Sequence, residues 1–127
     1  MAKTTQITVT AESKPGVLAK VCEALANAGV NIVAVCAADA AGRGKIRLVV
    51  SDPARAKEAL VAAKIRCGEE PALLLSMDDR PGALARVASR LAAAKINIKC
   101  AYATTGGGKA QVVVVVANPD KAERALG

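Results

Sequence analysis

Hydrophobic and polar residues alternate over Gln6–Thr10, and this period of two predicts a β-strand with one buried face. The spacing then becomes helical, because one apolar stripe is formed by Leu18, Val21, Cys22 and Leu25. Two β-rich runs, Asn31–Ala38 and Lys45–Val50, flank a turn that contains glycine. A second helix is expected from Pro53, and a short strand over Ile65–Cys67. The predicted order is strand, helix, strand, strand, helix, strand.

The whole pattern occurs twice. Residues 14–32 read KPGVLAKVCEALANAGVNI, and residues 80–98 read RPGALARVASRLAAAKINI, which places Pro15 and Pro81 66 positions apart. The same offset joins Leu60 to Leu126 without a gap. A duplication of this kind predicts two tandem units, with residues 1–70 as the first repeat and residues 71–127 as the second. The second repeat ends in or just after its second helix, so its own last strand is expected to be missing.

Both ends of the first helix carry residues that suit helix termini. Pro15 is expected in the first turn, where the N–H that it lacks is not needed. Gly29 is expected to end the helix as a left-handed cap.

The order of elements in each repeat is that of a ferredoxin-like fold, an α+β unit in which both helices cover one face of an antiparallel sheet. Two such small units are marginally stable alone, because small domains bury little surface. The strand expected over Gln111–Val116 is apolar on both faces, whereas Lys45–Val50 alternates. A strand of the first kind is usually covered on both sides. We therefore expect a second surface on it, most simply a second copy in a homodimer.

The two repeated stretches resemble an ACT domain. The resemblance rests on a polar or charged residue followed by Pro-Gly-x-Leu-Ala, a V-x-x-x-L-A helix and a closing Asn-Ile, and it extends over nearly the whole chain. It implies a stand-alone regulatory protein of two ACT domains that binds an amino acid beside the loop after the first strand. A regulatory subunit that docks on an enzyme of amino-acid metabolism is the alternative. The implied ligand-binding residues are Glu12, Ser13, Lys14, Gly16 and Asn31 in the first repeat and Asp78, Asp79, Arg80, Gly82 and Asn97 in the second.

The chemistry of these positions suits a zwitterion. A helix N-terminus offers free N–H groups to a carboxylate, and a glycine lets an anion approach the backbone. Lys14 and Arg80 are cations at the unfavourable end of a helix, which an anion nearby would explain; the alternative is that they extend into water. Acidic residues could bind the ammonium group. Because the second loop, DDRPG, has two acids where ESKPG has one, we expect the second repeat to be the better site.

Two of these residue types also have purely structural interpretations. Ser13 and Asp79 could be helix caps. Asn31 and Asn97 could be turn residues that close the connection from helix to strand. The sequence leaves these alternatives open.

Composition disfavours other functions. The chain has no histidine, the most common general base, and its four scattered cysteines lack the spacing of a zinc site. We therefore predict no catalytic residue, metal or cofactor, and reduced thiols in a cytoplasmic protein. The net charge of +7 favours anions in general, but with Tyr102 as the only aromatic residue a nucleic-acid interface is disfavoured. The longest apolar run, Val112–Ala117, is too short to cross a membrane.

Overall fold

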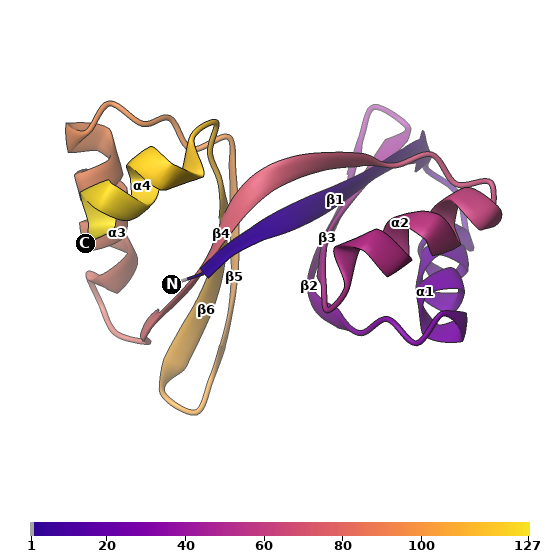
Figure 1. Cartoon of the computed structure of the whole chain (residues 1–127), viewed down its shortest axis with the longest axis horizontal. Coiled ribbons are helices and arrows are strands. Elements are labelled where there is room, and N and C mark those ends of the chain that lie inside the picture. Colours follow the sequence, from indigo (N-terminus) through magenta and orange to yellow (C-terminus); the bar gives the residue numbers. More distant parts are fainter. Residues whose placement is uncertain (1) are drawn as a thin grey trace. The chain divides into compact units, whose positions relative to one another are not determined.

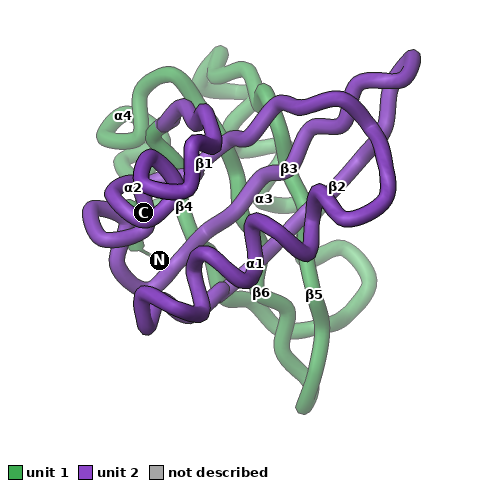
Figure 2. Tube along the Cα trace, turned by 90° about the vertical axis from the view of Figure 1, so that its right-hand side faces the viewer, with its two compact units in different colours: residues 1–4, 71–127 green, residues 5–70 purple. Residues whose placement is uncertain are grey.

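The computed structural model describes residues 2–127, which divide into two compact units (Figure 2). One unit consists of residues 5–70. The other combines residues 71–127 with the described residues that precede Thr5. Each unit is an antiparallel sheet with two helices, so the predicted α+β, ferredoxin-like fold class is confirmed.

The unit of residues 5–70 has its helices on one face of the sheet (Figure 1). Its strand order is β2-β3-β1, and the first residues of β4 lie beside β1. In the antiparallel pairing of β1 with β3, Ile7 lies opposite Leu48 and Val9 opposite Ile46. The elements are β1 (Ala2–Glu12), α1 (Val17–Asn27), β2 (Ile32–Ala40), β3 (Arg43–Val50), α2 (Pro53–Ala62) and the start of β4 (Gly68–Asp78).

The core of this unit follows the predicted periodicity. The inward residues of β1 and β3 meet Val21 and Leu25 of α1 and Leu60 of α2, all of which are buried. The apolar stripe predicted for the first helix is therefore the stripe that packs on the sheet. Leu18, the second residue of α1, belongs to that predicted stripe but remains 42% exposed.

The second unit repeats the same arrangement. Its strands follow the order β4-β6-β5, and the first residues of β1 lie on the other side of β4. Lys3 of β1 donates a hydrogen bond to Asp120 Oδ1 at 2.7 Å, within this unit. The fourth strand that the second repeat lacks is thus supplied by residues from the start of the chain. Its further elements are α3 (Ala83–Ala93), β5 (Cys100–Gly106), β6 (Lys109–Val115) and α4 (Pro119–Leu126).

The prediction of a separate strand over Ile65–Cys67 is wrong. These residues are not in a strand, and the next strand, β4, runs without interruption from Gly68 to Asp78. The reason is that β4 contributes its first residues to the unit of residues 5–70 and the others to the second unit. One long strand therefore replaces the two short ones that the sequence pattern suggested.

The strand β6 is buried on both faces, as its composition indicates. Val112 and Val114 belong to the core beneath the helices of the second unit. Val113 and Val115 point to the opposite face and are each 1% exposed. The homodimer expected from this composition stays a prediction.

Candidate functional site

The loop between β1 and α1 is shaped by a glycine in the left-handed region. Gly16 has a φ of 90° and is the N-cap of α1, which begins at Val17. Pro15 therefore precedes the helix and does not lie in its first turn, contrary to the prediction. A side chain at Gly16 would meet no atom within 4 Å, but its backbone would be strained at this φ. The turn itself thus requires glycine.

This turn leaves the start of α1 without a side-chain cap. By contrast, Asp52 Oδ1 caps α2 by accepting a hydrogen bond from the Arg55 N–H at 3.1 Å, and Asn118 caps α4 in the same way. The interpretation of Ser13 as a helix cap is therefore wrong. Because the first N–H groups of a helix have no partner inside it, those of α1 can donate to an anion.

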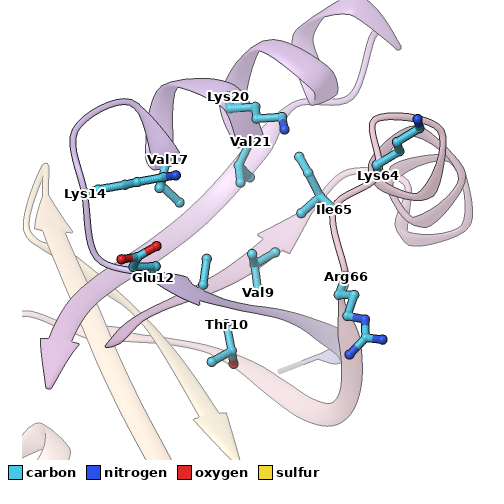
Figure 3. A pocket seen from close by; sticks show the side chains of 11 residues that line it. Val9, Thr10, Glu12, Lys14, Val17, Lys20, Val21, Lys64, Ile65 and Arg66 are labelled. Carbon is cyan, nitrogen blue, oxygen red and sulfur yellow. The ribbon is translucent and has the colours of Figure 1, made fainter. Parts of the chain in front are cut away.

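A pocket of about 330 Å³ opens beside this loop (Figure 3). It is formed by β1, the first turns of α1 and the segment between α2 and β4. Its volume is in the range of small-molecule sites. The lining residues are Val9, Thr10, Ala11, Glu12, Lys14, Val17, Lys20, Val21, Lys64, Ile65 and Arg66.

The pocket has an apolar floor and a charged rim. Val9 and Val21 are each 1% exposed and belong to the core, which fixes the floor. Four cations and one carboxylate surround it: Lys14, Lys20, Lys64, Arg66 and Glu12. Within residues 2–127 none of these five side chains takes part in an ion pair or a side-chain hydrogen bond. Their charges are available to a ligand.

A second, shallower hollow of about 210 Å³ lies on the other side of the same loop. It shares Glu12 and Lys14 with the first pocket and adds Ser13, Leu18 and residues of β2 and β3. The predicted residues Glu12, Ser13 and Lys14 therefore lie together around the loop. Gly16 lies at its end and determines the turn.

Asn31 lies away from these residues. It follows the C-terminal end of α1, a helix of 11 residues and thus about 16 Å in length. Its N–H donates to Ser51 Oγ at 3.0 Å, and its carbonyl oxygen accepts from the Ser51 N–H at 2.9 Å. Asn31 lines neither hollow, and its backbone closes the connection from α1 to β2.

In the second repeat the corresponding acid is already paired. Asp78 accepts a hydrogen bond from Lys109 Nζ at 2.6 Å, and this bond, with the charge of Lys109, holds the pKa of Asp78 below its usual value. Gly82 has a φ of 88° and, like Gly16, begins a helix without a side-chain cap. The interpretation of Asp79 as that cap is therefore also wrong.

The two repeats also differ at the residue before this acid. Ala11 lines the pocket in the first repeat, whereas Met77 takes its place in the second and packs against the core there. Arg80 and Asn97 are both exposed, and Asn97 follows the end of α3 as Asn31 follows that of α1. A larger side chain thus stands at the position before the acid in the second repeat than in the first.

Three pocket cations were not among the residues predicted from the sequence. Lys20 lies three residues after Val17 and therefore on the same side of α1, so the helical pattern could have predicted that it lines the pocket. Lys64 and Arg66 come from the far end of the repeat, and only the folded chain brings them to the pocket. Lys64 has a φ of 62°, which turns the chain after α2 toward β4.

Comparison with known families settles which family has this arrangement. Residues 2–126 match the family described as an ACT domain pair. The chain belongs to the ACT domain family. The resemblance stated from the two repeated stretches is thereby confirmed over nearly the full length of this ACT domain pair.

Solved structures of other proteins have a similar fold. Protein BT0572 from Bacteroides thetaiotaomicron is 33% identical, with a TM-score of 0.91 over 98% of this chain and 86% of that one. The regulatory subunit of aspartate kinase from Thermus thermophilus is 22% identical, with a TM-score of 0.71 over 98% and 93%. The aspartate kinase of Clostridium acetobutylicum is 16% identical, with a TM-score of 0.66 over 98% of this chain and 32% of that one. No curated protein matches the sequence significantly.

Two other kinds of site are absent from residues 2–127. No helix there is long and apolar enough to cross a membrane. No group of three or more histidine, cysteine, aspartate or glutamate side chains is placed to hold a metal ion.

Proposed function

We propose that this ACT domain pair is a regulatory protein that binds an amino acid in the pocket beside the β1–α1 loop of the first repeat. The observation that carries this proposal is the pocket itself, which joins an uncapped helix N-terminus, a carboxylate and unpaired cations around an apolar floor. The role is regulatory and not catalytic, and the four free thiols suit the reducing cytoplasm.

Each part of an amino acid has a matching group in the pocket. The N-terminus of α1 and Lys14 can bind the carboxylate, because both present hydrogen-bond donors and positive charge. Glu12 can accept from the ammonium group. The side chain of the ligand would then extend over Val9 and Val21 toward the segment that contains Ile65.

A thermal-shift screen against the twenty amino acids tests the proposal. A ligand at a hundredfold excess over its Kd stabilises the folded protein by about 2.7 kcal/mol, so a specific ligand should raise Tm by several degrees. Lys14→Gln should weaken the response. Lys45→Gln is the matched control, because Lys45 is exposed on β3 and lines neither hollow. No shift for any amino acid at millimolar concentration would count against the proposal.

The edge of the first sheet supports self-association. β2 is the edge strand of its unit, and Val33 and Val35 are each 47% exposed on it. An apolar edge strand is a template for pairing with another chain. We therefore keep the homodimer as part of the proposal, with β2 as its contact. Val35→Lys should convert the dimer to a monomer in light scattering; a wild-type protein that is monomeric at high concentration would rule the dimer out.

Docking on a separate enzyme is the second candidate function. Leu18 and Leu84 occupy the same place in the two repeats and are 42% and 48% exposed, which suits contact with a partner. The similar Thermus thermophilus structure is a regulatory subunit of aspartate kinase. If the chain is such a subunit, it should co-elute with an amino-acid-metabolism enzyme, and Leu18→Ser with Leu84→Ser should abolish that without unfolding the protein.

A further inference from the structure

The charges around the first-repeat pocket are unequally divided. Figure 3 shows Glu12 and Lys14 at one end of the pocket, Lys64 and Arg66 at the other, and Lys20 on α1 between them. Val21 and Ile65 lie between these two ends. The first end therefore holds one positive and one negative charge, and the rest of the pocket holds three positive charges and no negative one.

A neutral amino acid would use only the first of these ends. Its carboxylate and ammonium groups are matched by Lys14, the start of α1 and Glu12. It would leave Lys20, Lys64 and Arg66 along the rest of the pocket with no anion to bind. No protein carboxylate within residues 2–127 forms an ion pair with any of the three.

We infer that the ligand is an amino acid with a second acidic group on its side chain, either a carboxylate or a phosphate. This inference rests on the proposed amino-acid site and deepens it. The second acidic group lies in the part of the pocket that Lys20, Lys64 and Arg66 line. Arg66 can bind such a group through two parallel N–H donors, and the positive charges of the two lysines favour an anion in the same pocket.

The length of the pocket agrees with this arrangement. Lys14 belongs to the loop before α1, Lys20 lies after the first turn of that helix, and Arg66 comes from the segment after α2. A ligand that reaches from the loop to Arg66 must therefore carry its two anionic groups apart. An α-carboxylate and a side-chain acid, separated by a short apolar linker over the Val9 and Val21 floor, have this form.

Isosteric pairs of amino acids test the inference with the full chain. Isothermal titration with glutamate against glutamine, and with aspartate against asparagine, compares ligands that differ by one charge and hardly in shape. We expect the acid to bind about tenfold more tightly or better than its amide, since hydrogen bonds between charged groups are the stronger ones. Titration with phosphoserine and with serine makes the same comparison for a phosphate group. Whichever acid, carboxylate or phosphate, binds with the higher affinity identifies the natural group.

Variants assign the preference to the cations. Lys20→Gln and Arg66→Gln should each reduce the affinity for the acid about tenfold and leave that for the amide almost unchanged. Lys45→Gln, outside the pocket, should alter neither affinity. Circular dichroism melting of each variant confirms that it is folded. The preference for the acid should also decrease as salt is added.

The possible failures are distinguishable. If amides bind as tightly as acids, or if Lys45→Gln weakens acid binding as much as Arg66→Gln, the acidic-ligand inference is overturned and the proposed amino-acid site stands. If no amino acid binds, or only inorganic phosphate does, the inference and the proposed function are both overturned.

Discussion

Gly29 and Lys95 occupy the same place in the two repeats and adopt the same backbone, which provides a matched test of how the helices end. Their φ angles are 72° and 60°. After α1 the Gly29 N–H donates to the Ala26 carbonyl at 3.0 Å, and after α3 the Lys95 N–H donates to the Ala92 carbonyl at 2.9 Å. The hydrogen bonds are alike, so only the residue differs.

The magnitude follows from the left-handed conformation. For a residue with a side chain it costs roughly 1–2 kcal/mol, and glycine in turn loses about 0.5–1 kcal/mol more in chain entropy on folding. Gly29→Ala should therefore lower the free energy of unfolding by about 1 kcal/mol. A Cβ at Gly29 would meet only Arg55 Nη1 at 3.9 Å, an ordinary contact, so no clash adds to this cost.

The reverse change should have the opposite sign. Lys95→Gly relieves the same strain but removes a cation near the C-terminus of α3, worth a few tenths of a kcal/mol. We expect a gain of about 0.5 kcal/mol. Urea denaturation measures both variants, and Lys95→Gln, which loses the charge and keeps the strain, is the control. If Lys95→Gly destabilises the protein as much as Gly29→Ala does, the assignment of the cost to backbone strain is incorrect.

Three further predictions concern a charge pair, a cap and the core. Lys109→Ala should raise the pKa of Asp78 toward its ordinary value, as NMR titration would show. A lowered carboxyl pKa stabilises the folded protein at pH values above the pKa of the unfolded state, and this contribution is lost as the pH falls through the pKa of the folded state. Only the wild type should show this loss. Asn118→Ala should cost about 1 kcal/mol in urea denaturation by removing the cap of α4, and Asn118→Asp should not. Leu60→Ala, at a buried position, should cost about 2–5 kcal/mol, against about 0.5 or less for Leu84→Ala on the surface.

The sequence predicted the elements that depend on local pattern. The stripe that includes Val21 and Leu25 packs on the sheet, and Gly29 ends α1 in the left-handed conformation, both as expected. The helices α3 and α2 are also followed by a residue with a positive φ, but these residues are Lys95 and Lys64 and not glycine, so the sequence does not mark them. Pattern therefore located the helices well, and failed where the backbone adopts a glycine-like conformation without glycine.

The pattern of hydrophobic and polar residues could not predict which distant segments lie side by side. Periodicity indicates that Gln6–Thr10 is a strand, but it contains no information about which unit its neighbours join. The position of Lys3 beside Asp120, and of Lys64 and Arg66 in the wall of the pocket, depends on chain paths that connect distant segments. Glu12, Ser13 and Lys14 were found because they are adjacent in sequence, whereas the cations opposite them were not.

The two repeats carry the same loop but present different surfaces to a ligand. Both begin their first helix with an uncapped left-handed glycine, so the turn alone cannot make one repeat a better site than the other. The difference arises from the neighbours of that turn. The acid is unpaired at Glu12, whereas Lys109 binds Asp78, and the residue before the acid is Ala11 in one repeat and Met77 in the other. From the sequence, the two acidic residues of the second loop favoured that repeat as the site. Because one of them is already paired with Lys109 and a larger side chain precedes it, the first repeat is the site to test.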